Sequence, residues 1–349
     1  MKKGMKRVFI GLLVVVCLVA AVLGFYTVME YRPDAIETIA AMSGNQKLSL
    51  QETLTILTMN TGYAGLDETQ DFFMDGGDKV RPESEEDIQN NLQGISNILK
   101  KYQSDIYFLQ EVDLNSKRSY FVDEQKFYEK QLGIPSLFAK NFQCTYVPYP
   151  WPPIGKVTSG IMTMSQYQVH EASRIALPES FSWPIKTANL KRCMLEARLP
   201  IEGSDKELVL INFHLEAYDS GEGKIAQTRM LAEKLSEEYA KGNYVIAGGD
   251  FNQTFEGVKE YPVVNQDTWV PGVISNNDLP EHFEFAIDDT YPTCRLLNQP
   301  YTGSYETSQV YIIDGFIVSD NIEVIKVENK NVDFTYSDHQ PVSLEVKLK

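Results

Sequence analysis

Residues 244–252 of the 349-residue chain have the sequence YVIAGGDFN. The apolar run Tyr244–Gly248 has the length and composition of a buried strand, and Asp250 and Asn252 follow where that strand ends. Asp, Asn and Gly all favour turns, so this segment alone would also fit a plain turn. Strand ends are places where a rigid scaffold presents functional groups, and the two polar side chains therefore mark a candidate site.

The same arrangement recurs along the chain, where polar residues end, interrupt or precede apolar runs. The predicted strands are Leu54–Asn60, Asp105–Val112, Gly160–Ser165, Met194–Leu199, Leu208–Leu215, Val310–Val318 and Val342–Val346. The polar residues are Asn60, Glu111, His214, Asp314 and the pair Asp338–His339. A buried carboxylate is costly unless it is paired or bound to a metal, so the acids, amides and histidines predict one oxygen-rich metal site.

Each of these residues taken singly also fits an ordinary structural role. An Asn at a strand end is usually a turn residue, as Asn60 could be. Glu111 also fits a solvated charge at the rim of a sheet, and His214 also fits a buried polar residue with its hydrogen bonds made. The argument for chemistry therefore depends on the ordered set and on no single member of it.

In chain order the set is Asn60, Gln110-Glu111, His214, Gly249-Asp250-Phe251-Asn252, Asp314 and Ser337-Asp338-His339-Gln340-Pro341. This set resembles the endonuclease/exonuclease/phosphatase superfamily, which includes pancreatic deoxyribonuclease, abasic-site endonucleases, neutral sphingomyelinases and inositol polyphosphate phosphatases. The resemblance covers about residues 54–349 and would make the chain a membrane-anchored, bacterial-type member. It implies an α/β fold, a four-layered sandwich of two mixed β-sheets flanked by helices.

The resemblance also implies a metal site. Glu111 matches the main metal ligand of the family, with Asn60 and Asp338 close to the same ion. Carboxylate and amide oxygens suit Mg²⁺, Mn²⁺ or Ca²⁺ better than zinc. The expected cofactor is therefore Mg²⁺, with Mn²⁺ and Ca²⁺ as alternatives.

Five further positions match catalytic residues of the family. Asp250 would orient or deprotonate the attacking water, and Asn252 would hold that water and a phosphate oxygen. His214 and His339 would lie against the scissile phosphate as protonated imidazoles, with Asp314 fixing the ring of His339. Whether Asp250 or His339 is the general base stays open. Such groups would stabilise the charge that develops during in-line attack of water on phosphorus.

The N-terminus predicts a membrane anchor. Val8–Met29 is an apolar run without a charge, long enough at about 1.5 Å per residue to cross a bilayer core. Four basic residues precede it, which predicts a cytoplasmic tail at residues 1–7 and an extracellular domain in a single-pass membrane protein. A cleaved signal peptide, leaving a secreted protein, is the alternative. Residues 30–50 are predicted to be a linker or a short helix, and residues 51–349 the catalytic domain.

Charge and cysteines limit the function classes. The net charge is −16, and because residues 1–34 carry +3, the remainder carries −19. Such an acidic domain lacks the basic stripe that binds nucleic acid non-specifically, which disfavours a nuclease without excluding one. Beyond the anchor, Cys144, Cys193 and Cys294 show no spacing typical of zinc sites, and one disulfide among them stays open.

Three local features could set the substrate. Asp71–Gly77 forms an insertion that is expected near the metal site, as a wall, a lid or an ordinary loop. Tyr146–Gly155 is rich in aromatic residues and proline, and Trp151 there could stack a base, enter the bilayer interface or be a plain surface residue. Arg118 and Tyr120 could contact a substrate phosphate, although Arg118 also fits a pairing with a local acid.

Three functions follow from these observations. The first is a metal-dependent hydrolase of lipid head groups or small phosphoesters near the membrane. The second is an anchored extracellular endonuclease or exonuclease, and the third is a binding protein that kept the fold without the chemistry. The predicted partners are thus a phosphoester substrate, which is a lipid head group, a small ester or a nucleic acid, and the lipid bilayer around the N-terminal helix.

Overall fold

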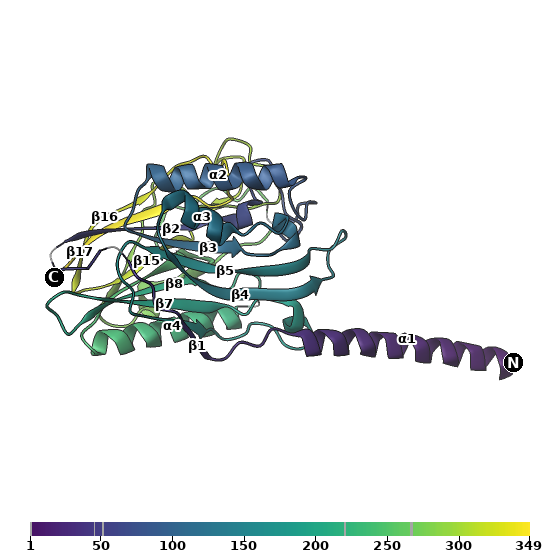
Figure 1. The fold of residues 1–349 in the computed structure, drawn as a ribbon. Helices are drawn as coiled ribbons and strands as arrows, with labels where there is room; N and C mark the ends of the chain where they lie inside the picture. Colours follow the sequence, from purple (N-terminus) through teal and green to yellow (C-terminus); the bar gives the residue numbers. More distant parts are fainter. Residues whose placement is uncertain (1, 45, 51, 220, 266–267) are drawn as a thin grey trace.

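The computed structural model describes residues 2–44, 46–50, 52–219, 221–265 and 268–349. Two mixed β-sheets pack face to face, and helices cover their outer faces (Figure 1). The helices are α1 (Lys2–Met29), α2 (Glu85–Lys101), α3 (Glu124–Leu132) and α4 (Glu222–Ala240). Short 3₁₀ helices lie at η1 (Gly62–Ala64), η2 (Phe73–Asp75), η3 (Lys117–Ser119), η4 (Ile185–Ala188) and η5 (Asn276–Asp278).

The first sheet has six strands in the order β16-β17-β2-β3-β5-β4. Their bounds are β2 (Thr53–Asn60), β3 (Ile106–Asp113), β4 (Ser136–Val147), β5 (Gly155–Ser165), β16 (Ile322–Asn329) and β17 (Val342–Leu348). The second sheet has the order β1-β6-β7-β8-β9-β15-β12. Its strands are β1 (Ile36–Ile39), β6 (Glu171–Ala176), β7 (Cys193–Pro200), β8 (Glu207–His214), β9 (Tyr244–Asp250), β12 (Phe283–Ala286) and β15 (Asp314–Ser319). Two small pairs join β10 (Gln253–Phe255) to β11 (Gly272–Ile274) and β13 (Cys294–Arg295) to β14 (Val310–Tyr311).

The side chains of the central strands alternate between two apolar cores. In β2, Leu54 and Ile56 point into the core between the two sheets, whereas Leu57 and Met59 point outward and pack with α2. On the other sheet, α4 packs Leu231 against the outer faces of β8 and β9. Both faces of these strands are buried, so their sequences are continuous apolar runs, and the expected four-layered sandwich is confirmed.

The start of α2 shows how local sequence sets an element. Ser84 accepts a hydrogen bond from the backbone N–H of Asp87, and the Asp87 carboxylate accepts one from the N–H of Ser84. This capping box satisfies two N–H groups that the first helical turn would leave unpaired.

Several elements differ from the expectation. Strands β4, β6 and β16 and helix α3 were missing from the prediction, because half-exposed strands with many polar residues lack a continuous apolar run. The predicted strand Val310–Val318 is two strands, since Ile312 and Ile313 separate β14 from β15. Cys144, Cys193 and Cys294 are buried free thiols, so the disulfide that the sequence left open does not form among them.

The segment after α1 is neither the expected free linker nor a helix. Within residues 30–50, β1 pairs antiparallel with β6, and Met42 and Leu48 form further bridges to the second sheet. The chain therefore joins the sandwich from β1 onward. Three residues of the predicted segments lie outside the described part of the chain: residue 1 of the predicted tail, residue 45 of the predicted linker and residue 51 of the predicted domain.

Candidate active site

The predicted site residues meet at one edge of the sandwich, where strands of both sheets end. Strands β2 and β3 run parallel and bring Asn60 beside Gln110 and Glu111. In the other sheet, the parallel pair β8 and β9 places His214 opposite Asp250, and the antiparallel pair β9 and β15 places Asp314 opposite Asp250. The ends of the inner strands therefore point one amide, one imidazole and three carboxylates toward the same space.

Two of these residues have a backbone conformation that L-amino acids rarely adopt. Glu111 has φ of 54° within an irregular register of β3, and Asn252 has φ of 51° just after β9. Such conformations cost on the order of 1–3 kcal/mol each and persist where the surrounding structure enforces them. The local bulge aims Glu111 away from the regular pleat, and the turn lets the Asn252 N–H donate to Asp250 Oδ1 at 2.8 Å.

An amide links the two carboxylates at the centre of the site. Asn60 Nδ2 donates to Glu111 Oε1 and to Asp250 Oδ2, each at 3.1 Å. Its oxygen accepts from the Gly62 N–H at 3.0 Å, which fixes the orientation of the amide. Asn60 is therefore held by its neighbours and spans the gap between Glu111 and Asp250.

Asp338 approaches from the loop before β17. Its carboxylate is buried and lies against Gly62, where a Cβ would come within 2.8 Å of Oδ1. Burial raises the pKa of Asp338 to about 7; His339 opposes this rise, and the nearby Glu111 reinforces it. Glycine at position 62, with φ of 53°, is what allows this close approach.

The donor set fits a divalent cation. Within the described part of the chain, no Lys or Arg forms an ion pair with Glu111 or Asp338. Two carboxylates held close together repel each other, as the effect of Glu111 on the pKa of Asp338 indicates, and a bound cation removes that cost. Oxygen donors of this kind suit Mg²⁺ or Mn²⁺, which makes Glu111 and Asp338 the candidate metal ligands. The predicted ligand Asn60 lies beside them, with its amide nitrogen turned to Glu111 and its oxygen on the Gly62 N–H.

A second acidic group lies beside the first and holds an imidazole. His339 Nδ1 is 2.8 Å from Asp314 Oδ2, and His339 Nε2 is 3.7 Å from Asp250 Oδ2. Potential ligand atoms of these three residues lie within 4.8 Å of one another. Burial lowers the pKa of His339, but the Asp314 carboxylate, with Cys294 and Asp250, outweighs it and holds the pKa well above its ordinary value. A protonated imidazole is a donor, so this group fits proton handling better than metal ligation.

His214 behaves differently from His339. Its Nε2 lies 3.3 Å from Asp250 Oδ2, while its buried Nδ1 has no hydrogen-bond partner among the described residues. Burial and the positive charge of Arg192 hold the pKa of His214 well below its ordinary value. The pKa values of the two imidazoles are thus shifted in opposite directions, toward the protonated form for His339 and toward the neutral form for His214, where the sequence analysis expected both to be protonated.

Asp250 and the neighbouring Asn252 are part of the same hydrogen-bond network. Burial raises the pKa of Asp250, with Asp314 adding to the effect and His339 opposing it. Asn252 Nδ2 donates to the Leu215 carbonyl at 2.9 Å, which fixes the orientation of its amide. Asp250 is thus the group that both imidazoles and the Asn60 amide share.

The three residues predicted to bind substrate do not all line the pocket. Arg118 lines the pocket, but its guanidinium is held by Asp113 through two hydrogen bonds of 3.0 and 2.9 Å and covers the ring of Tyr63. Tyr120 is not among the pocket residues, because its hydroxyl donates to the Pro82 carbonyl. Trp151 is 90% exposed and also lies outside the pocket. The structure therefore places one of the three at the site.

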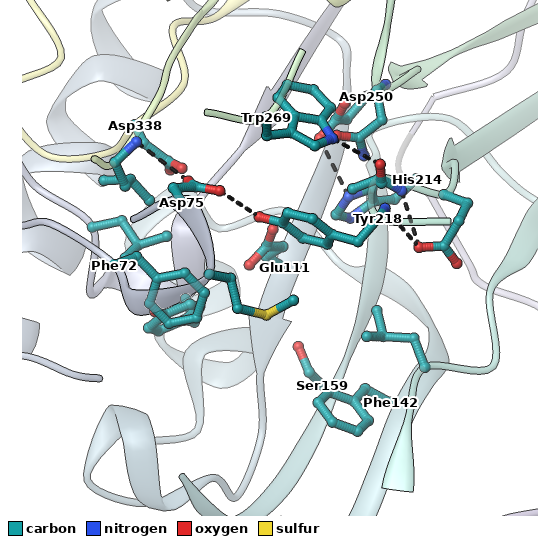
Figure 2. Close-up of a pocket in the computed structure, with 18 of the residues that line it drawn as sticks. Phe72, Asp75, Glu111, Phe142, Ser159, His214, Tyr218, Asp250, Trp269 and Asp338 are labelled. Atoms are coloured by element: carbon teal, nitrogen blue, oxygen red, sulfur yellow. Dashed lines mark hydrogen bonds and ion pairs between the residues drawn. The ribbon is translucent and has the colours of Figure 1, made fainter. Parts of the chain in front are cut away.

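The site opens into a pocket of about 520 Å³. The Asp71–Gly77 insertion supplies part of its wall through Phe72, Met74 and Asp75, as its position in the sequence suggested. Asp75 Oδ1 accepts a hydrogen bond of 2.8 Å from the hydroxyl of Tyr218. Figure 2 shows this pair crossing the pocket close to Glu111.

Among the pocket residues that sequence reasoning missed are Arg192, Tyr218 and Trp269. Trp269 Nε1 donates to the Ala217 carbonyl and its ring lies near Tyr218, so both belong to one loop cluster. Arg192 donates to the His214 carbonyl at 3.2 Å. Only Tyr218 carried a signal, its place four residues after His214, since loops that follow such strand ends commonly line a site.

Comparison with known proteins places this geometry in a family. A model of the Endonuclease/Exonuclease/phosphatase family matches residues 88–339, which is more than half of the chain. The chain belongs to the endonuclease/exonuclease/phosphatase family. This family includes metal-dependent phosphoesterases and nucleases, and its members typically use divalent metals.

Solved structures of the endonuclease/exonuclease/phosphatase fold match at low sequence identity. The endonuclease/exonuclease/phosphatase from Beutenbergia cavernae is 17% identical, with a TM-score of 0.56 over 85% of this chain and 72% of its own. A protein of that family from Bacteroides vulgatus is 14% identical, with a TM-score of 0.56 over 86% and 100%. The human Nocturnin catalytic domain is 15% identical, with a TM-score of 0.52 over 86% and 97%. These structural similarities show the fold. A search of curated proteins found no match.

Proposed function

We propose that this family member is a divalent-metal-dependent hydrolase of phosphoester bonds, acting on lipid head groups or small phosphoesters near the membrane. One observation carries the proposal. The buried Asp314–His339–Asp250 group is linked to Glu111 through the Asn60 amide, which donates to both Asp250 and Glu111, and Asp338 directly precedes His339 in the chain. A proton-handling group next to a cation site is what hydrolysis of a phosphoester by water requires.

Glu111 and Asp338, with Asn60 between Glu111 and Asp250, would hold the cation. When bound, a divalent cation there would stabilise negative charge on the phosphoryl oxygens. Asn60 would keep its place through the Gly62 N–H, because that bond uses its oxygen and leaves Nδ2 for the carboxylates. Glu111 also has a strained backbone, and strain of this kind is common where a residue is positioned for function.

Proton handling divides between Asp250 and His339. His339 lies between the carboxylates of Asp314 and Asp250, which keep its ring protonated, so it donates a hydrogen bond and cannot accept a proton. Asp250 is an acceptor with a raised pKa, and a base is most effective when its pKa is close to the working pH. We therefore assign Asp250 to accept the proton of the attacking water and His339 to donate to a phosphate oxygen.

The charges in the pocket favour a small ester or a lipid over a nucleic acid. Each arginine that lines the pocket is already engaged: Arg118 by Asp113, Arg192 near Glu216, and Arg295 by backbone carbonyls of residues 66–70. A nuclease needs free basic groups along the path of the backbone phosphates, and the chain has a net charge of −16. The nuclease function is therefore the second candidate, supported by family membership alone.

The cellular position forms part of the proposal. Gly4–Met29 is long and apolar enough to cross a membrane, which fits either an anchor or a signal sequence. We propose the uncleaved anchor, with the tail at residues 1–7 in the cytoplasm and the domain outside the cell, because Glu30 and Thr27 at the end of α1 bond to the domain. A secreted form after cleavage is the alternative.

The test uses the full chain in phosphatidylcholine nanodiscs with Mg²⁺ or Mn²⁺. Plasmid DNA, a sphingomyelin-type lipid and a chromogenic phosphodiester are assayed side by side, with Asp250→Ala as the control. Turnover of the lipid or the small ester that disappears in the control supports the proposal. Nicking of DNA alone makes the protein a nuclease, and no turnover of any substrate supports a binding protein on the same fold.

A further inference from the structure

The catalytic domain is attached to the end of α1 by buried contacts. Glu30 and Lys191 form an ion pair of 2.9 Å in which both side chains are nearly inaccessible to solvent. Trp183 Nε1 donates to Thr27 Oγ1 at 3.0 Å, and α1 contacts the 3₁₀ helix η4. A buried pair between a helix end and the domain holds the two in one orientation, which a flexible linker would not do.

The same region forms the apolar wall of the pocket. One hydrophobic cluster joins Tyr26 of α1 to Phe142 and to four partly buried residues of the neighbouring loops, Val147, Ile154, Ala188 and Leu190. All of these except Tyr26 also line the pocket that contains Glu111 and His214. One continuous cavity therefore has a polar, acidic end at the strand termini and an apolar end beside the base of α1.

Exposed aromatic and aliphatic side chains surround that apolar end. Within the described residues they are Tyr146 at the end of β4, Tyr149 and Trp151 in the β4–β5 loop, Trp183 just before η4 and Ile185 in η4. Figure 1 shows that the β4–β5 hairpin reaches toward the side of the molecule from which α1 leaves. Trp and Tyr are enriched at the membrane–water interface, where one end of the ring is apolar and the other is wet.

We propose that the apolar end of the pocket binds the hydrocarbon part of a phosphoester lipid, and that this aromatic rim rests in the membrane interface beside α1. The inference rests on the proposed function, since it places the phosphorus of the lipid at Glu111 and His214. The whole pocket, of about 520 Å³, is large enough for a head group at its polar end together with a hydrocarbon segment at its apolar end. Docking of the domain on α1 then keeps the pocket at the bilayer surface.

Binding of alkyl phosphates tests the apolar end. The ligands are ethyl, butyl, hexyl and octyl phosphate, measured by calorimetry on the full chain in phosphatidylcholine nanodiscs, with the heat of partition into empty nanodiscs subtracted. Each added methylene that enters the pocket should tighten binding roughly fourfold until the apolar end is filled. A series with no dependence on chain length, or adenosine monophosphate binding more tightly than octyl phosphate, would overturn the proposal.

A matched pair of variants locates the effect. Ile154→Gln should lower the ratio of octyl to ethyl phosphate affinity by about tenfold, because it puts an amide into the apolar wall. Ile154→Leu keeps the volume and the apolar character and should hold that ratio within about threefold. A ratio that stays at the wild-type value in Ile154→Gln would place the alkyl chain elsewhere and overturn the assignment.

The interface contact has its own readout. A chain with Trp183→Phe and Trp269→Phe keeps only Trp151, and its fluorescence is compared in nanodiscs with and without brominated acyl chains. Contact with the bilayer should make Trp151 less fluorescent in the brominated nanodiscs, because an interfacial ring lies against the upper part of the acyl chains. A chain that keeps only Trp269, which lies inside the pocket, is the control, and equal fluorescence of Trp151 in both nanodiscs would overturn the membrane contact.

These readouts separate the inference from the proposed function. Calorimetry and fluorescence need no turnover, so the chain-length dependence can be present in a protein that hydrolyses nothing. Hydrolysis of the chromogenic diester without any chain-length dependence would keep the proposed function and overturn the lipid pocket. Chain-length dependence without hydrolysis of any ester would keep the pocket and overturn the proposed function.

Discussion

Replacement of Asp314 by Asn isolates the role of one buried carboxylate. Asp314 Oδ2 lies 2.8 Å from Nδ1 of His339, and neither side chain is exposed by more than a few per cent. The amide of Asn has nearly the same shape and can still accept one hydrogen bond, but it removes the negative charge that faces the ring. Asp314→Asn should therefore keep the fold while weakening the hold on a protonated His339.

The magnitude follows from the kind of bond that is lost. A hydrogen bond between charged groups contributes about 1.5–3 kcal/mol, against about 1 kcal/mol for a neutral one. The difference of about 0.5–2 kcal/mol means that, if the transition state depends on the protonated ring, kcat/KM should fall roughly twofold to thirtyfold. The Asp314 carboxylate raises the pKa of His339, so its removal lowers that pKa. Activity that needs the protonated ring should then decline at lower pH in Asp314→Asn than in the wild type.

The assay is kcat/KM for a chromogenic phosphodiester between about pH 5 and about pH 10, with saturating Mg²⁺ or Mn²⁺. The chain contains a matched control, because Asp320 Oδ2 lies at the same 2.8 Å from Nδ1 of His282, with both side chains about half exposed. Asp320→Asn should leave the rate and the pH profile unchanged. Activity of Asp314→Asn within about threefold of wild type, with the alkaline limb in its original place, would refute the reasoning.

Four further outcomes are expected. Asp250→Ala or His339→Ala should abolish turnover with an unchanged circular dichroism spectrum, and more than a small residual rate in either would contradict the assigned roles. Chelation should remove activity and Mg²⁺ or Mn²⁺ restore it, whereas full activity in excess chelator would exclude a metal. Glu238 lies buried among Arg198, Lys234 and Lys241, which lower its pKa to about 2 despite burial. Glu238→Gln should therefore lower the unfolding free energy by about 2–3 kcal/mol above about pH 5. Denaturant melts at both pH values should show this loss vanish toward pH 2, where the wild-type carboxylate becomes protonated as well. Protease added to intact cells should trim the domain, and complete protection would place it inside.

Much of the site could be predicted before the fold was known. Strands that are buried on both faces leave continuous apolar runs visible in the sequence. Such a run ends at Glu111 or Asp250, is interrupted by Asp314, or is preceded by His339. Parallel neighbours must bring their ends to the same edge, so the order of motifs along the chain also predicted their meeting. The pKa of His214 could not be predicted, because it depends on burial and on Arg192, which lies 22 residues earlier in the chain, just before β7.

Elements with mixed polarity were harder to predict. Strand β4 alternates buried and exposed side chains with several polar residues, so no local pattern separates it from a loop until β5 pairs with it. Residues 30–50 have too few apolar residues for their pattern to predict a strand. Strand β1 forms there because it pairs with the edge strand β6. In the same way, Arg118 has the character of a phosphate ligand in sequence, and only the fold shows that Asp113 already holds it.

By itself the sequence determined the fold family, the ordered set of site residues and an N-terminal segment able to cross a membrane. These depend on local patterns: periodic burial, strand ends and an uninterrupted apolar run. Tertiary structure alone decided that the Tyr218–Asp75 pair crosses the pocket, that Glu30 pairs with Lys191, and that the apolar end of the pocket adjoins α1. Such contacts join residues more than a hundred positions apart, and their energies depend on burial and distance that no local stretch of sequence contains.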